Sequence, residues 1–144
     1  MSNNIYFFTE DINFNLKHRN AIRQWIKNIV AAEEKKIDSI NYIFCSDNYL
    51  FKLNIDYLKH NTLTDVITFN YSEDNINGDV FISIERIKEN AKIFKQKFYI
   101  ELLRVIVHGT LHLCGYKDKS KKDKHLMQSK EDFYLSKLDF SIIQ

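Results

Sequence analysis

One segment near the end of the chain, from His108 to Asp118, constrains the fold more than any other part of the sequence. His108 and His112 are four residues apart, so on a helix both imidazoles lie on one face and can reach a single metal ion. Gly115 suits the left-handed conformation that ends a helix, and the turn that follows can carry Asp118 to the same ion. Three protein ligands with one position left for water are typical of a catalytic zinc site. The segment therefore predicts one Zn²⁺ ion per chain, bound by His108, His112 and Asp118.

Two other residues could supply the third ligand in place of Asp118. His125 would lie one turn inside the next helix, and the spacing favours Asp118 over it. Cys114 offers a soft sulfur donor, but it comes two residues after His112 and therefore lies about 200° round the helix from it. We expect Cys114 to face the core.

Gly109 separates this motif from that of the zinc proteases. The spacing of His108, His112, Gly115 and Asp118 follows the long protease motif, but that motif has a glutamate base directly after its first histidine. A glycine there disfavours a peptidase and is expected to leave space beside the metal. The residues identify no catalytic group beyond the metal-bound water. The base would be a metal-bound hydroxide, a hydroxyl group of the substrate itself or a residue from elsewhere in the chain.

Hydrophobic periodicity predicts the elements around the motif. Trp25 belongs to an apolar helical stripe, and we expect it in the core. The predicted strands cover about residues 5–9, 39–46, 65–71 and 79–84, with a turn cluster at 74–78. The predicted helices cover about residues 17–36, 47–58, 85–97, 100–114 and 120–138. Ser120 and Asp123 resemble a capping box for the last helix. The pattern predicts an α+β domain of about four strands and about five helices.

Composition narrows the class of protein. The chain of 144 residues has the size of one domain, with 44% apolar residues and a net charge of +2. We therefore expect residues 1–144 to form a single domain. No apolar run approaches the roughly 20 residues of a membrane span, and the N-terminus lacks the features of a secretory signal. Two cysteines make no disulfide framework, so we expect a cytoplasmic protein without a membrane partner.

Several segments, in the right order, resemble the YbeY family of bacterial rRNA maturation factors. The metal motif is similar to the family's His-Gly-x-Leu-His-Leu-x-Gly-Tyr-Asp-His through Tyr116, after which this chain has Lys117 and Asp118 where the family usually has Asp-His. Residues 64–69 look like the family's Thr-Asp-Val-Leu-Ser-Phe, and residues 78–83 look like its Gly-Asp-Ile-x-Ile-Ser strand. The resemblance runs from about residue 50 to residue 118. It implies a small mixed sheet with helices packed around it.

The same resemblance implies a function. The family members are taken to be single-strand-specific, metal-dependent endoribonucleases that act in rRNA maturation, including processing of the 16S rRNA 3′ end, and in ribosome biogenesis. The implied partners are single-stranded rRNA and the small ribosomal subunit, and no DNA is expected. The alternative is a ribosome-associated assembly or binding factor with a mainly structural metal. The residues by themselves indicate only a metal-dependent hydrolase.

A lysine-rich run directly after the metal motif is a candidate contact for substrate. Lys119, Lys121 and Lys122 are its central members. Such a run fits either a solvated face or a surface that attracts the phosphates of RNA, and its position beside the metal motif gives the second interpretation equal standing.

The upstream segment offers further candidates. Residues 54–57 look like the start of the YbeY family's Asn-x-x-Tyr-Arg segment, whose arginine falls on Leu58 in this chain. Lys59 and His60 are therefore the adjacent groups that could supply a cation. Thr64 and Asp65 open a predicted strand. For these two residues we expect local turn and backbone hydrogen bonds ahead of direct catalysis.

Overall fold

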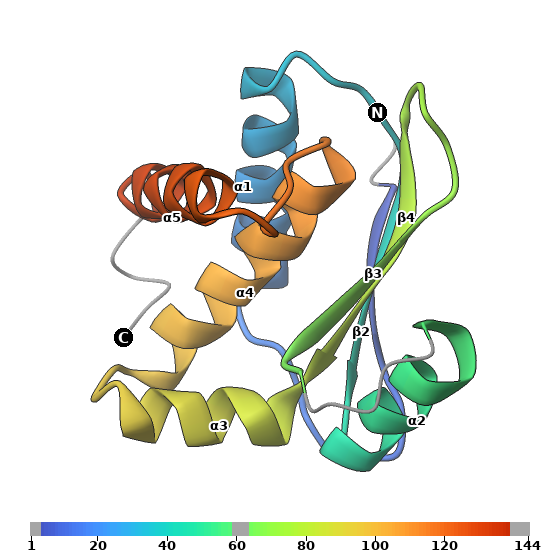
Figure 1. Ribbon diagram of the computed structural model, residues 1–144, viewed down its shortest axis with the longest axis vertical. Helices are drawn as coiled ribbons and strands as arrows, with labels where there is room; N and C mark the ends of the chain where they lie inside the picture. Colours follow the sequence, from blue (N-terminus) through green and yellow to red (C-terminus); the bar gives the residue numbers. More distant parts are fainter. Residues whose placement is uncertain (1–3, 59–63, 139–144) are drawn as a thin grey trace.

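The structure is a computed structural model that describes residues 4–58 and 64–138. Within these ranges the chain forms four strands and five helices (Figure 1). The strands are β1 (Ile5–Thr9), β2 (Ile37–Cys45), β3 (Val66–Asn70) and β4 (Ile76–Ser83). The helices are α1 (Arg19–Ala32), α2 (Asp47–Leu58), α3 (Ile84–Ile93), α4 (Phe98–Leu113) and α5 (Lys121–Leu135). No helix in the described ranges is long and apolar enough to span a bilayer.

The strands form one mixed sheet in the order β1-β2-β4-β3. β1, β2 and β4 run parallel to one another, and β3 pairs antiparallel with β4. α1 and α4 lie on one face of the sheet, α5 lies on the outer side of α4, and α2 lies on the opposite face (Figure 1). This arrangement confirms the expected α+β fold, with a small mixed sheet packed between helices.

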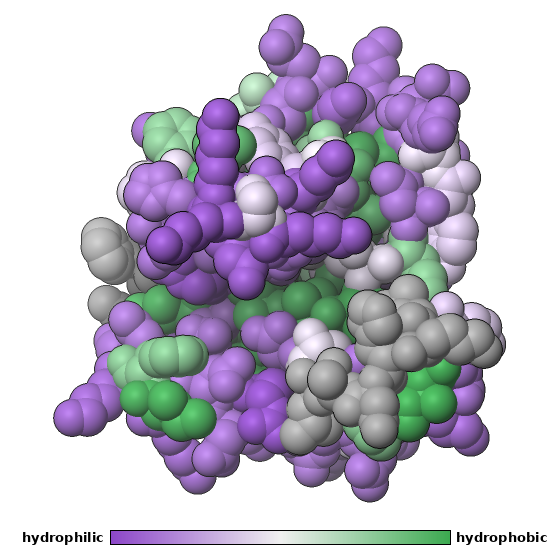
Figure 2. Space-filling model, in the orientation of Figure 1, coloured by the Kyte–Doolittle hydropathy of each residue, from purple (hydrophilic) through white to green (hydrophobic). Residues whose placement is uncertain are grey.

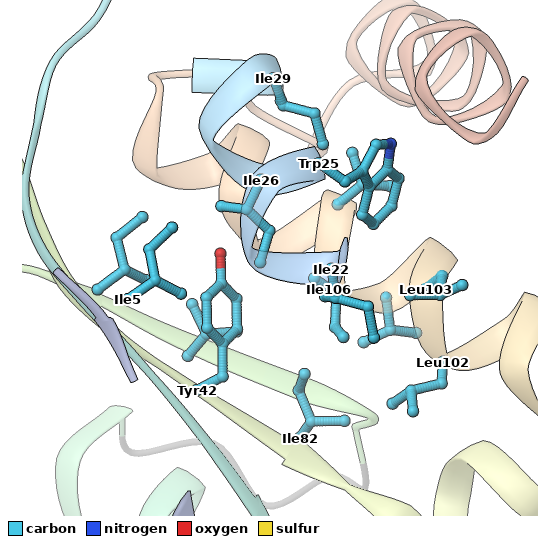
Figure 3. Close-up of a cluster of buried hydrophobic side chains, with 14 of the residues drawn as sticks. Ile5, Ile22, Trp25, Ile26, Ile29, Tyr42, Ile82, Leu102, Leu103 and Ile106 are labelled. Atoms are coloured by element: carbon cyan, nitrogen blue, oxygen red, sulfur yellow. The ribbon is translucent and has the colours of Figure 1, made fainter. Parts of the chain in front are cut away.

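The main core fills the space between the sheet and the layer of α1 and α4 (Figure 3). The apolar stripe of α1 is buried as its spacing predicts, and Trp25 is 5% exposed. The indole N–H of Trp25 donates to the backbone oxygen of Tyr134, at 2.9 Å. Trp25 is therefore a core residue, as expected, and it also joins α1 to α5.

α4 carries the metal motif and is buried on most of its circumference. A polar contact inside the core fixes it against β2. The hydroxyl of Thr110 donates to the backbone oxygen of Ile106 at 2.7 Å, so it accepts from the hydroxyl of Tyr42, at 2.6 Å. Burial raises the pKa of the Tyr42 hydroxyl, which keeps it a proton donor. The rotation of α4 about its axis is thereby set from within the core.

Gly109 has a different role from the one expected. A Cβ at this position would lie 2.6 Å from Cγ1 of Val80 and 3.4 Å from Cγ2 of Thr68. The residue therefore faces the sheet, about 100° round the helix from His108. The expectation that Gly109 leaves space beside the metal is wrong, because β4 occupies that space and the missing side chain lets α4 approach the sheet.

Gly78 lies inside β4 rather than in the turn predicted at 74–78. A Cβ there would lie 2.5 Å from the backbone oxygen of Phe69 and 2.6 Å from Cδ2 of Leu113. β4 consequently begins at Ile76, ahead of the predicted start at residue 79. The absence of a side chain at Gly78 lets the last residue of α4 approach β3 and β4 closely.

Gly78→Ala should lower the free energy of unfolding by about 1–3 kcal/mol, the usual range for overpacking, because the added methyl group collides with the backbone of Phe69 and with Leu113. Urea denaturation followed by circular dichroism measures this change. Asn77→Ala is the matched control, since it removes atoms from the neighbouring strand position. Equal stability of Gly78→Ala and the wild type would contradict the assignment.

Candidate metal centre

His108 and His112 lie one turn apart on α4, and Asp118 approaches both of them from the loop that follows the helix. The two Nε2 atoms are 3.1 Å apart. Oδ2 of Asp118 is 3.3 Å from Nε2 of His108 and 3.4 Å from Nε2 of His112. The structure therefore brings together the three residues that the sequence predicts as metal ligands.

The turn after α4 is a Schellman motif, and it explains how Asp118 returns to the helix. The N–H of Tyr116 donates to the backbone oxygen of Leu111, and the N–H of Gly115 donates to that of His112, both at 3.0 Å. Gly115 has a φ of 108°, a conformation that other residues rarely adopt. This turn reverses the chain directly after the second histidine, as its sequence predicts.

Hydrogen bonds at the outer nitrogen of each imidazole orient both rings. Nδ1 of His112 lies 2.9 Å from the backbone oxygen of Tyr116, which can only accept, so Nδ1 carries the proton. Nδ1 of His108 lies 2.6 Å from Oε2 of Glu131, a carboxylate oxygen that also accepts. Both rings therefore direct the lone pair of Nε2 toward Asp118, as histidines that bind metals do.

Three acceptor atoms facing one another repel unless a cation lies between them. Ligand atoms placed tetrahedrally at about 2.0–2.2 Å from zinc are about 3.3–3.6 Å apart. The separations of 3.1, 3.3 and 3.4 Å observed here are close to that geometry. The side chains of His108, His112 and Asp118 are 21%, 23% and 40% exposed, so a fourth ligand position can face solvent. The donor atoms and their spacing thus fit one divalent metal ion.

Glu131 is the residue near this cluster that sequence reasoning missed. It is 7% exposed on α5, where its Oε1 accepts from Nη1 of Arg104 at 3.0 Å while its Oε2 contacts His108. Burial lowers the pKa of His108, but the hydrogen bond and charge of Glu131 outweigh burial and raise it. The same negative surroundings favour a metal cation. An acidic residue in the apolar stripe of α5, four residues after Met127, was the signal that the sequence offered.

Another carboxylate, the partly buried Glu33 at the end of α1, holds the loop between α4 and α5. This loop, residues 114–120, carries Asp118 and is called the ligand loop below. It accepts from the hydroxyl of Tyr116 at 2.7 Å, from the hydroxyl of Tyr134, and from the ammonium of Lys130 at 3.3 Å. Burial raises the pKa of Glu33, but the hydrogen bonds from Tyr134 and Tyr116 outweigh burial and lower it. Glu33 therefore stays ionised and joins the loop to α1 and α5. The same Tyr116 supplies the backbone oxygen that orients His112.

Two further acids line a small cavity beside His108. Asp65 and Glu101 border this cavity, whose volume is about 110 Å³. Burial raises the pKa of Asp65, and burial together with the charge of Asp65 raises the pKa of Glu101. Acids with raised pKa values beside the three candidate metal ligands are candidates for proton transfer. Thr64 makes the local hydrogen bond expected of it, from its hydroxyl to the backbone oxygen of Val66 at 3.2 Å.

The predicted substrate-binding residues are either exposed or outside the described ranges. Lys119, Lys121 and Lys122 are exposed in the segment that follows Asp118, and the last two belong to the first turn of α5. The Ser120 and Asp123 capping box predicted for this helix is present. Lys59 and His60 lie outside the described residues.

The two competing ligands are placed away from the cluster. His125 is exposed on α5 and is not among the grouped donors within the described ranges. Cys114 packs against the main core, as expected, and burial raises the pKa of its thiol to about 11.

The family model and the curated relatives that match this chain carry the same family description. The family model described as "Endoribonuclease YbeY" matches residues 4–139. Two relatives carry the same description: one from Flavobacterium johnsoniae is 51% identical over 87% of this chain and 91% of its own length, and one from Amoebophilus asiaticus is 48% identical over 92% and 91%. The solution structure of TM1509 from Thermotoga maritima has a TM-score of 0.65 at 28% identity, covering 92% of this chain and 87% of that one.

Glu131→Ala should weaken metal affinity by roughly 10- to 100-fold, because the proton and the ring orientation of His108 are then no longer fixed. Competition with a chromophoric chelator measures this change. Asp132→Ala is the matched control, since Asp132 also pairs with Arg104 but does not contact His108. Asp118→Ala shows for comparison how far zinc affinity falls when one of the three proposed ligands is removed. Equal zinc affinity for Glu131→Ala and the wild type would contradict the role of Glu131.

Proposed function

The chain belongs to the YbeY endoribonuclease family, and from this premise we propose that it is a zinc-dependent endoribonuclease that cuts single-stranded RNA. Its substrate is rRNA, including the 3′ end of 16S rRNA, and its partner is the small ribosomal subunit. The protein then acts in ribosome biogenesis in the cytoplasm. The observation that carries this proposal is the acceptor cluster of His108, His112 and Asp118, whose spacing and open side suit a catalytic metal.

The proposed cofactor is one Zn²⁺ ion, held by His108, His112 and Asp118. When bound, such an ion supplies Lewis-acid chemistry at a phosphoryl group. The chain supplies the orientation of both imidazoles, through Glu131 and the backbone oxygen of Tyr116. We propose no peptidase activity, since the position that carries the glutamate base in zinc proteases is a glycine packed against the sheet.

The proposed phosphate contacts are Lys119, Lys121 and Lys122, which are exposed in the segment that follows Asp118. Exposed lysines attract a phosphate chain as point charges and leave base sequence unread. Lys59 and His60 are proposed as contacts from the sequence alone, in the place of the family arginine.

An assembly factor with a mainly structural metal is the second candidate. The observation in its favour is that Glu33 joins the ligand loop to α1 and α5, while Glu131 on α5 contacts His108 on α4. Chelation separates the two functions. A structural site should unfold when the metal is removed, whereas a catalytic site should lose activity and remain largely folded.

Purified protein loaded with zinc should cleave single-stranded rRNA fragments, and a chelator should abolish cleavage without unfolding the protein. His112→Ala should be inactive, because it removes one of three ligands. Gel analysis of the RNA measures cleavage, and circular dichroism of the same samples measures folding. Cleavage that persists in His112→Ala would contradict the proposed site, and unfolding on chelation would favour the assembly factor.

Replacing Lys119, Lys121 and Lys122 together by Ala should weaken RNA binding and flatten its salt dependence. The slope of log affinity against log salt should fall by roughly 0.7 to 1 unit for each phosphate that a removed lysine had neutralised. Metal content should stay unchanged, since none of the three is in the ligand cluster. The measurement is a titration with one short RNA, single-stranded and then annealed, at several salt concentrations.

A matched control makes the same charge change on other surfaces. Lys36, Lys52 and Lys88 are exposed and lie on other segments. Their joint replacement by Ala should leave the slope close to that of the wild type. Equal slopes in both triple variants would show that the run after Asp118 is only a solvated face.

A further inference from the structure

We infer that a cavity between α3, α4 and α5 binds one nucleoside of the RNA strand, with its base stacked on Phe94. This inference rests on the proposed function and names a subsite for the same substrate. The cavity has a volume of about 450 Å³ and is lined by His108 and Asp118, two of the three candidate metal ligands. Binding pockets for small ligands have volumes of about 300–1,000 Å³, so the cavity can accept a base and its ribose.

The walls of the cavity come from separate parts of the chain. Phe94 and Gln96 lie at the junction of α3 and α4, Lys124 and Gln128 lie on α5, and the buried Met127 adds an apolar surface. Figure 2 shows a hollow with apolar residues on its floor, bordered by hydrophilic side chains over α5. An apolar interior with polar groups at its edge suits a flat aromatic ligand.

Phe94 is the feature that points to a nucleobase. Its side chain is 63% exposed although it lines the cavity, so a large aromatic surface faces solvent beside the metal cluster. Bases of single strands stack on aromatic side chains of this kind, whatever the sequence. The neighbouring Ile93 is equally exposed, at 61%, but does not line the cavity. Ile93 is therefore a control residue that is as exposed as Phe94 but lies outside the cavity lining.

The charges of the lining favour an uncharged ligand group. Arg104 and Glu131 form an ion pair with 3.0 Å between Nη1 and Oε1, so neither presents a free charge to the cavity. Burial raises the pKa of Glu101, which lines the cavity as well. A phosphate would find no net positive charge inside, apart from Lys124 at the edge. A base and ribose fit better, with the side-chain amides of Gln96 and Gln128 able to donate to and accept from a base edge.

The cavity adjoins the candidate metal ligands, and this sets the position of the nucleoside in the strand. Because His108 and Asp118 border both sites, a phosphate at the cluster and a base in the cavity belong to neighbouring positions. A base can enter only when it is unpaired and unstacked, which is easy in a single strand and costly in a duplex. The subsite would therefore give a physical reason for single-strand preference.

The test uses 2-aminopurine, whose fluorescence falls when it stacks on an aromatic ring. A short single-stranded RNA carries this base at each position in turn, and fluorescence is recorded on rapid mixing with the zinc-loaded protein, before the strand is cut. We expect one position to be quenched by the wild type. Phe94→Ala should remove that quench and weaken affinity roughly 5- to 100-fold, the range for the loss of one stacked base. Phe94→Tyr should restore both, and Ile93→Ala should change neither.

The outcomes separate the subsite from the proposed function. Wild-type protein that binds the RNA with no quenched position, or a quench that survives in Phe94→Ala, would overturn the subsite and leave the endoribonuclease proposal standing. Wild-type protein that binds no RNA would overturn both. Because Phe94 is largely exposed, Phe94→Ala is expected to fold, and its zinc content should equal that of the wild type.

Discussion

Mutual repulsion among three acceptor atoms is the constraint on which the rest of this site depends. Nε2 of His108, Nε2 of His112 and Oδ2 of Asp118 lie within 3.4 Å of one another, and a cation between them removes the repulsion. Such an arrangement persists only if each acceptor is fixed from outside. Glu131 and the backbone oxygen of Tyr116 fix the imidazoles, and the Schellman turn fixes the loop of Asp118.

All three glycines of the chain serve the helix that carries the histidines. Gly109 lets α4 lie against β4, Gly78 lets the end of α4 approach β3 and β4, and Gly115 permits the turn that follows. Two of these positions concern close packing and one concerns a positive φ. The precision of the ligand cluster therefore depends on how α4 is seated on the sheet, since a shift of the helix would move both imidazoles relative to the loop.

Local patterns predicted most of the fold and the ligand cluster, because helical spacing, a capping box and a glycine stop are properties of neighbouring residues. Long-range partners were not predictable in this way. Glu131 is 23 residues from His108, and Glu33 is 83 residues from Tyr116, so only folding reveals these contacts. The role of Gly109 was predicted wrongly for the same reason, since its packing partner Val80 lies on a distant strand. Residues close together in the sequence supplied the candidate ligands, and the fold supplied the groups that orient them.

Asp118 alters the electrostatics of the site relative to the histidine usual in the YbeY family. Two neutral imidazoles and one carboxylate would leave a bound divalent ion with one net positive charge instead of two, which would weaken its attraction for a phosphate. Lys117 and Lys119, both exposed, flank Asp118 in the chain and restore positive charge beside the position where the carboxylate reduces it. The Debye length is about 8 Å at physiological salt, so the effect of these exposed charges should weaken as the salt concentration rises. The proposed carboxylate ligand and the basic run are therefore best understood together, as one distribution of charge around the proposed RNA substrate.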